Sequence, residues 1–204
     1  MSRHAALDWA PGIALAAALA SLSGAAAATA PEHALGSPKA PVTVVEYASV
    51  GCPHCATWAN EVFPAFKKQW IDTGKVRFVF HEMITGDSEL AVAGFMIADC
   101  APPDRYFQVV DDIFADQAGV AQGGGTALLK VAKAAGMTPA QFDACLTDHQ
   151  ALADLQARTD KDAQDHGVEF TPTFFVNGRK LNGDPTLKDL DAAIQSAERA
   201  RRKG

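Results

Sequence analysis

The segment SVGCPHCATW, residues 49–58, constrains the fold more than any other part of the chain. It follows residues 42–47, VTVVEY, whose β-branched and aromatic composition predicts a strand. After it, apolar residues recur at a spacing of four and predict a helix: Trp58, Val62, Phe66 and Trp70. The two cysteines of the segment, Cys52 and Cys55, therefore lie where a strand passes into a helix.

Four kinds of site use a cysteine pair with the spacing of Cys52 and Cys55. Haem attachment places a histidine directly after the second cysteine, and that residue is Ala56 here. Zinc needs four ligands, and the sequence holds no second closely spaced pair. A purely structural disulfide at this spacing would close a loop too small to constrain much of the unfolded chain. A redox-active pair is the interpretation with positive support.

The position of the pair favours an acidic thiol. A cysteine at a helix N-terminus faces unpaired N–H groups and the positive end of the helix dipole, which stabilise its thiolate. Pro53 suits the first helical turn, where no N–H donor is needed. His54 adds a second stabilising charge when it is protonated. We expect Cys52 to be the exposed sulfur that substrate attacks, and Cys55, one turn deeper, to resolve the mixed disulfide.

Beyond this segment the chain predicts one α/β domain. Residues 75–80 alternate like a second strand, and Pro64 predicts a kink in the helix between the strands. Helical patterns then follow at 91–100, 105–116, 126–135, 138–146 and 150–166, the fourth opened by a capping box. The three glycines at 123–125 are expected to form a loop. They are not a phosphate-binding loop, because no Lys-Ser/Thr follows them.

Strand signals return at residues 173–176 and 179–181, joined by an Asn-Gly pair that predicts a hairpin. A last helix is expected at 187–199, with Thr186 as its cap. The predicted order is β–α–β, a helical block, then β–β–α. Pro172 stands at the start of the third strand; an edge proline with a trans peptide bond is the default there, and proximity to a redox pair suggests cis.

The first 28 residues are typical of a secretory signal peptide, with an uncleaved membrane anchor as the alternative. A weakly basic start precedes a short apolar run, and small residues then lead to a cleavage site after Ala28 or Ala30. The apolar run is too short to span a bilayer. Export would place the four cysteines in oxidising surroundings. The net charge of −6 argues against nucleic-acid binding, since no basic excess is available to neutralise phosphates.

The strand–CPHC–helix junction, the helical block and the downstream segment TPTFFVNG together resemble the DsbA-like thiol:disulfide oxidoreductases. The resemblance covers about residues 42–199 and implies a thioredoxin fold with a helical insertion between its βαβ and ββα halves. It implies domain bounds of 29–84 and 168–204 for the thioredoxin-like part and 85–167 for the insertion. It further implies a cis Thr171–Pro172 bond packed against Cys52, in a loop that pairs with an extended substrate peptide.

Two further assignments accompany the resemblance. Glu46 matches the buried acid of the family, with a role in moving protons to and from Cys55; an outward-facing strand carboxylate is the alternative. Cys100 and Cys145 are expected to form a second, structural disulfide, as similar extra pairs do in some members of the family. A regulatory or shuttle role for that pair, and two free buried thiols, are the alternatives.

The predicted function is that of a periplasmic oxidase that introduces disulfides into exported polypeptides through Cys52 and Cys55. No metal, flavin or nucleotide site is expected, because the redox pair is itself the electron carrier. The resemblance also implies a quinone-linked membrane protein that re-oxidises the pair. A disulfide isomerase, a client-specific reductase and a copper chaperone that uses Cys52, His54 and Cys55 as soft ligands are the alternatives.

Overall fold

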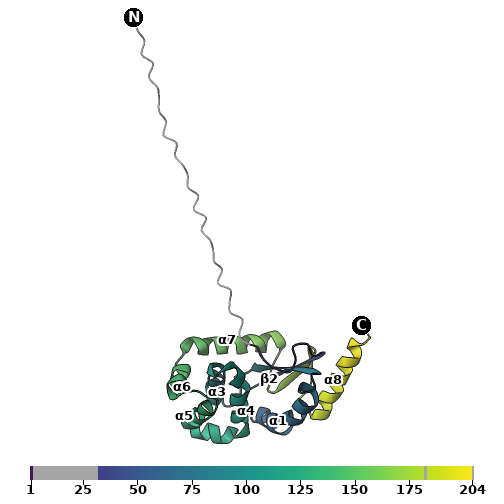
Figure 1. Cartoon of the computed structure of the whole chain (residues 1–204), viewed down its shortest axis with the longest axis horizontal. Helices are drawn as coiled ribbons and strands as arrows, with labels where there is room; N and C mark the ends of the chain where they lie inside the picture. The colour runs from purple at the N-terminus through teal and green to yellow at the C-terminus, as the bar shows by residue number, and fades with distance from the viewer. Residues whose placement is uncertain (2–31, 182, 204) are drawn as a thin grey trace.

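The computed structural model of the chain describes residue 1, residues 32–181 and residues 183–203 (Figure 1). Apart from Met1, the signal peptide expected over residues 1–28 lies outside these ranges and stays a prediction. Within the described ranges, no helix combines the length and the apolar character that crossing a membrane requires.

The centre of the described molecule is a five-stranded mixed sheet in the order β1-β3-β2-β4-β5. Its strands are β1 (His33–Leu35), β2 (Val42–Ala48), β3 (Val76–Glu82), β4 (Thr173–Val176) and β5 (Arg179–Lys180). β2 is the central strand and pairs parallel with β3 and antiparallel with β4. The site that follows β2 is therefore carried by a strand with a hydrogen-bonded neighbour on each side.

The helices confirm the predicted order of a thioredoxin fold interrupted by a helical insertion, α3 to α7. The helical segments are α1 (Pro53–Glu61), α2 (Phe63–Phe66), the π-helical η1 (Lys67–Ile71), α3 (Ser88–Cys100), the 3-10 turn η2 (Pro103–Arg105), α4 (Tyr106–Ala115), α5 (Gln117–Ala134), α6 (Pro139–Leu146), α7 (His149–His166) and α8 (Leu187–Arg201). The insertion helices gather at one end of the molecule, and α8 lies at the other (Figure 1).

The three glycines at 123–125 lie at a break between two helical halves of α5, which is shorter than the loop expected from the sequence. Gly124 alone leaves helical geometry, with φ 53° and ψ −140°, and kinks the helix. Buried residues on both sides of the kink, Val120 before it and Leu128 and Val131 after it, belong to the main core. Tertiary packing thus outweighs the poor helix propensity of glycine.

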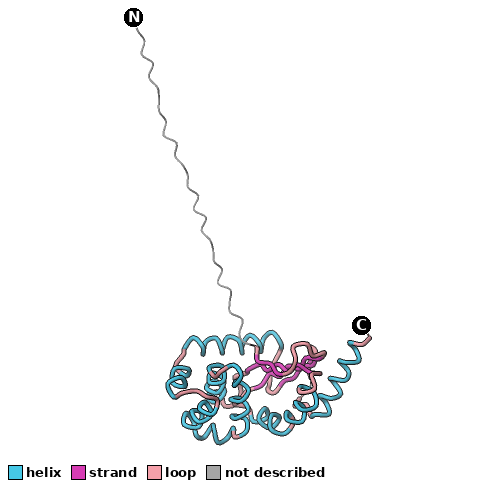
Figure 2. Tube along the Cα trace, in the orientation of Figure 1, coloured by secondary structure: helices cyan, strands magenta, loops and turns pink. Residues whose placement is uncertain are grey.

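The two faces of the sheet are covered by different helices, which Figure 2 shows on either side of the strands. On one face Trp58 of α1 stacks with Phe78 and contacts Phe174 in a tilted arrangement, and Leu190 and Ile194 of α8 belong to the same core. On the other face a smaller cluster of Tyr47, Met83 and Val168 packs with Ala163 of α7. Alternate residues of β2 consequently face α1 or α7.

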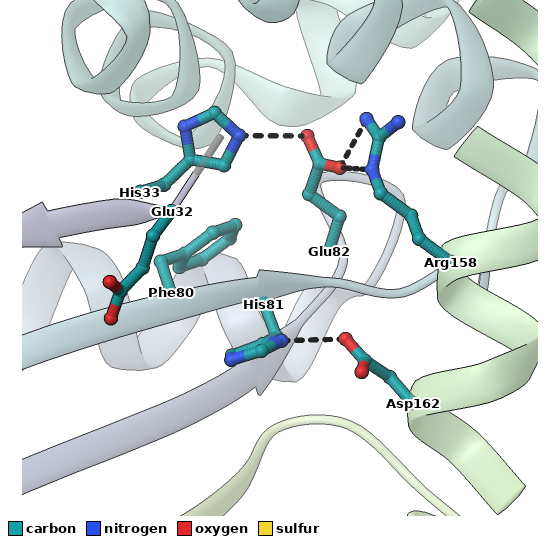
Figure 3. A pocket seen from close by; sticks show the side chains of 7 residues that line it. All are labelled: Glu32, His33, Phe80, His81, Glu82, Arg158 and Asp162. Carbon is teal, nitrogen blue, oxygen red and sulfur yellow. Dashed lines mark hydrogen bonds and ion pairs between the residues drawn. The ribbon is translucent and has the colours of Figure 1, made fainter. Parts of the chain in front are cut away.

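Ionic contacts fasten α7 to the sheet (Figure 3). The buried Glu82 carboxylate at the end of β3 accepts hydrogen bonds from Arg158 Nε at 2.7 Å and from the Tyr106 hydroxyl at 3.0 Å. One residue earlier on β3, His81 Nδ1 lies 2.6 Å from Asp162 Oδ2 of α7. These contacts satisfy a carboxylate that would otherwise be costly to bury.

A disulfide joins the end of α3 to α6 within the insertion. It links Cys100 to Cys145, whose Cα atoms are 6.2 Å apart and whose positions are separated by 45 residues in the sequence. The pairing expected from the sequence is therefore present in the structure. Whether its role is structural stays a prediction.

Candidate active site

The cysteine pair lies at the N-terminus of α1, directly after the central strand β2. Cys52 is the N-cap residue in extended geometry, Pro53 is the first helical residue, and Cys55 lies within the first turn. Both thiols are free. Cys52 is only 7% exposed, which corrects the expectation of an exposed sulfur, and Cys55 is fully buried. Cys52 is the outer sulfur of the two, as the position at the helix end requires.

The surroundings of Cys52 favour its thiolate and lower its pKa to about 5. A hydrogen bond from the Cys55 side chain is the largest cause, and burial of the sulfur opposes it. The Thr171 side chain and the main-chain groups of Cys55 and His54 add to the lowering. A thiol at a helix N-terminus with several donors aimed at it is a ready nucleophile and a good leaving group at neutral pH.

Cys55 has the opposite character. Burial raises its pKa far above that of an ordinary thiol, and its hydrogen bond to Cys52 and the charge of Glu46 act in the same direction. The main-chain N–H of Ser49 lies 3.5 Å from its sulfur and opposes the shift. Cys55 is therefore a protonated thiol that solvent does not reach.

The loop before β4 packs against Cys52. The Thr171–Pro172 peptide bond is cis, as the resemblance implied, and Pro172 is buried. The Cys52 thiol lies 3.4 Å from the Thr171 carbonyl oxygen, to which it donates. The Thr171 hydroxyl lies 2.6 Å from that of Thr85, in the loop that follows β3. Two loops far apart in sequence thus meet at the outer cysteine.

His54 points away from the pair toward a partner that the sequence analysis did not anticipate. Its side chain is 74% exposed, and Nδ1 lies 3.0 Å from Oδ2 of Asp184 in the segment that leads to α8. The neighbouring Trp58 indole N–H donates to the carbonyl of Pro185 at 3.1 Å. Both contacts tie the active-site helix to the segment before α8.

Two glycines allow the active-site loop to lie directly on the loop after β3. A Cβ at Gly51 would overlap the Asp87 carbonyl oxygen, and a Cβ at Gly86 would overlap the Gly51 carbonyl oxygen. Gly86 also has φ +71°, a conformation that favours glycine. The Asp87 N–H donates to the Gly51 carbonyl at 2.9 Å. This close main-chain contact fixes the position of the loop that carries Cys52.

Gln117, the first residue of α5, is a site residue that the sequence analysis missed. Its side-chain Nε2 donates to the carbonyl oxygens of Val50 at 2.7 Å and of Cys52 at 3.1 Å. The insertion therefore holds the active-site loop through one amide. The sequence signal was weak, because a glutamine at a helix start is common on protein surfaces.

Glu46 of β2 lies under the pair and is 3% exposed, so it is not an outward-facing carboxylate. It stands between Phe80 and Phe174 in the sheet register. Burial raises its pKa well above the usual range, and the charges of Asp111 and Cys52 raise it further. Its role in moving protons stays a prediction at this point.

One cluster in the described part of the chain has metal-ligand composition, and it lies away from the cysteines. His33, Glu82 and Asp99 offer ligand atoms within 4.8 Å of one another. Arg158 forms ion pairs with both carboxylates, at 2.6 Å to Glu82 Oε2. The guanidinium already neutralises the two carboxylates. The cluster is therefore better explained as a set of ion pairs that hold α7 against the sheet than as a metal site.

Comparison with known proteins agrees with this geometry. The Thioredoxin family model matches residues 28–196, most of the chain. The chain belongs to the DsbA-like, thioredoxin-fold disulfide oxidoreductases. A Bacillus anthracis relative named "Probable disulfide bond formation protein D" is 32% identical over 169 residues, which cover 80% of this chain and 76% of that protein.

Other DsbA-like proteins resemble the chain over a similar length. A Rickettsia bellii protein named "Putative protein-disulfide oxidoreductase" is 31% identical over 166 residues, 80% of this chain. The chain spans only 63% of that protein's length. The crystal structure of Wolbachia pipientis alpha-DsbA1 matches with a TM-score of 0.76 and 25% identity, over 86% of this chain and 95% of that one. The fold prediction is confirmed.

Proposed function

We propose that this DsbA-like protein is a thiol:disulfide oxidase that introduces disulfides into exported polypeptides in the periplasm. The observation that carries the proposal is that the pKa values of the two thiols are shifted in opposite directions. Cys52 has its pKa lowered to about 5, whereas the pKa of Cys55 is raised by burial. Stabilising the thiolate of the reduced pair makes the disulfide form a stronger oxidant. Membership of the family and the Thr171–Pro172 loop beside Cys52 support the same reaction.

The reaction begins with the oxidised pair. A substrate thiolate attacks Cys52 Sγ, the bond between the two cysteines breaks, and its electron pair goes to Cys55 Sγ, which takes up a proton. A second substrate thiol loses its proton and attacks the substrate sulfur of the mixed disulfide, and Cys52 leaves as a thiolate. The substrate has lost two electrons and the pair has gained them. A quinone-linked membrane protein would take these electrons away.

The reduction potential of the pair tests the oxidase role. Equilibration with glutathione mixtures should give a value at the oxidising end of the range for such proteins, and the oxidised protein should restore disulfides in a reduced test protein. A potential near that of thioredoxin, about −270 mV, would contradict the proposal. Cys52→Ala should abolish the reaction. Cys55→Ala should accumulate a mixed disulfide when it is given an oxidised test protein, because its Cys52 thiolate attacks a substrate disulfide, releases one substrate thiolate and has no neighbour to resolve the bond.

The same assays distinguish the alternatives. Rearrangement of a scrambled substrate without net oxidation would identify an isomerase. Tight stoichiometric binding of Cu(I), with no oxidation of the test protein, would identify a copper chaperone. Export is tested separately by cell fractionation of the full chain and of a chain that lacks residues 2–28, and only the former should reach the periplasm.

A further inference from the structure

A small cavity lies between the buried Glu46 and Asp111 of the helical insertion. It has a volume of about 20 Å³ and is lined by Glu46 of β2 and Asp111 of α4. The rest of its wall is mainly apolar and aromatic, with Phe80 of β3 and Phe107 of α4 among its members. A cavity of this volume holds about one water molecule. Asp111 as a residue is exposed to solvent, whereas its carboxyl group is partly buried.

Glu46 has few ways to exchange a proton with solvent. Among the described residues, none donates a hydrogen bond to its carboxyl group. In the sheet its neighbours in register are Phe80 and Phe174, which cannot carry protons. On the side of α1 it meets the cysteine pair, whose sulfurs interact with it electrostatically. The cavity toward Asp111 is therefore the polar exit left to this carboxyl group.

Asp111 is tuned for proton exchange near neutral pH. Partial burial raises its pKa to about 6, and the charge of Asp112 acts in the same direction, whereas Lys67 of η1 opposes the shift. A group with a pKa near the working pH passes protons in both directions with little loss of driving force. The charge of Asp111 in turn raises the pKa of Glu46.

We propose that Asp111 is a proton-relay residue that acts through Glu46, and that protons travel between solvent and Cys55 by way of Asp111, the cavity and Glu46. The inference rests on the proposed thiol–disulfide exchange at Cys52 and Cys55. It adds a residue of the helical insertion to the machinery of the thioredoxin-like part.

The relay balances the protons of the reaction. When substrate reduces the pair, Cys55 leaves Cys52 with the electron pair and takes a proton from Glu46, which recovers one from Asp111 and solvent. When the pair is oxidised again, Cys55 gives its proton back along the same path. Cys52 stays a thiolate at neutral pH, so only one proton per cycle has to reach the buried sulfur.

The test compares Asp111→Asn with Asp112→Asn, which removes the same charge one residue away. Asp112 lines a different cleft and does not reach Glu46. The oxidised proteins are reduced by excess dithiothreitol, and thiolate absorbance is followed across pH. Asp111→Asn should slow reduction at pH 7 by about tenfold, less than loss of a general acid–base group itself costs, because the cavity still admits water. The dependence of the Asp111→Asn reduction rate on pH should lack the ionisation near pH 6 that the wild type shows.

Rescue separates a relay from a structural effect. A high concentration of a small buffer such as imidazole should restore the rate of Asp111→Asn, and Asp111→Glu should keep most of the wild-type rate. Asp112→Asn should keep the wild-type maximal rate and show no dependence on buffer, with the ionisation of Asp111 moved to lower pH because the charge of Asp112 no longer raises its pKa. Equal rates for Asp111→Asn and wild type, or equal losses in both variants, would overturn the relay. If wild-type protein fails to exchange with the dithiol at all, the proposed function fails instead.

Discussion

At the scale of single residues, the active site gives opposite pKa shifts to two chemically identical thiols that lie in one helical turn. Cys52 receives hydrogen bonds at the helix end and has a lowered pKa, whereas Cys55 is enclosed and has a raised one. Opposite shifts of neighbouring titratable groups assign their roles, as nucleophile or leaving group on one side and as protonated partner on the other.

The Thr171 hydroxyl provides a first prediction. Because its contact lowers the pKa of Cys52, Thr171→Val should raise that pKa by the order of one unit, the equivalent of one hydrogen bond to a charged group. Ultraviolet absorbance of the thiolate against pH measures the change. Thr85→Val is the matched control, since it removes the hydroxyl partner of Thr171 but leaves the contact with Cys52. An unchanged titration in Thr171→Val would contradict this cause.

Glu46 provides a second prediction, on stability. A carboxyl group whose folded pKa is raised stabilises the fold fully below its unfolded pKa, about 4.5, and this contribution is lost as pH rises through the folded value. Glu46→Gln should therefore raise the free energy of unfolding at pH 7 by about 1–3 kcal/mol. The gain should disappear near pH 4. Denaturant unfolding of the oxidised proteins at the two pH values checks both statements.

The residues that could be predicted from the sequence are those defined by their neighbours in the chain. Cys52, Pro53 and Cys55 follow from the strand-to-helix junction, and Pro172 from the family motif. Glu46 could not be placed on a face of β2 by alternation, because the residues around it are apolar on both faces. Asp111 and Gln117 reach the site from helices more distant in the sequence, and only tertiary structure brings them there.

At the scale of elements, the helical insertion is part of the active site's support. Gln117 at the start of α5 holds the Val50 and Cys52 carbonyls. The short strand β1 was not predicted, because three residues carry too little pattern; it exists through its pairing with β3. The three glycines of α5 predicted a loop because glycine has a low helix propensity. Packing of the buried residues before and after them limits the break to a kink at Gly124.

A third prediction tests the support from α5. Gln117→Ala should lower the free energy of unfolding by about 1–2 kcal/mol, because two buried or half-buried carbonyls lose a donor. Gln122→Ala, an exposed glutamine on the same helix, should change it little. Chemical denaturation of both variants gives the comparison. Equal effects would mean that the loss is one of helix propensity and not of the contact.

A fourth prediction concerns the disulfide between α3 and α6. Replacing Cys100 and Cys145 together by alanine should lower the free energy of unfolding by about 4 kcal/mol, as expected for a closed loop of this length in the chain-entropy model. Thiol–disulfide exchange at Cys52 should continue in the folded variant. Loss of exchange without loss of folding would favour the regulatory or shuttle role over the structural one.

At the scale of the whole molecule, redox state and stability are linked through Cys52. A group whose folded pKa is lowered stabilises the fold fully above its unfolded pKa, near 9, and that stability is lost as pH falls through the folded value of about 5. The fifth prediction is that the thiolate favours the reduced protein over the oxidised one by roughly 2–3 kcal/mol at pH 7. Thermal unfolding of both forms should show the higher Tm for the reduced form.

The pH dependence of the difference in Tm between the reduced and oxidised forms tests this prediction. At pH 4 the thiolate is protonated in the folded protein, so the Tm values of the two forms should converge. A difference that persists unchanged at pH 4 would show that something other than Cys52 ionisation sets it. Cys55 does not enter this balance, because it is protonated at both pH values in the folded state.

The main-chain contact between Gly51 and Gly86 has a consequence for protein engineering. Neither glycine tolerates a Cβ against the other loop. The conformation of the CPHC segment therefore depends on its contact with residues 85–87, which are distant in the sequence. A graft of residues 49–55 into another scaffold would carry the cysteines without this supporting loop. A graft that keeps the shape of this loop therefore needs at least two segments, 49–55 and 85–87, moved together with their relative placement preserved.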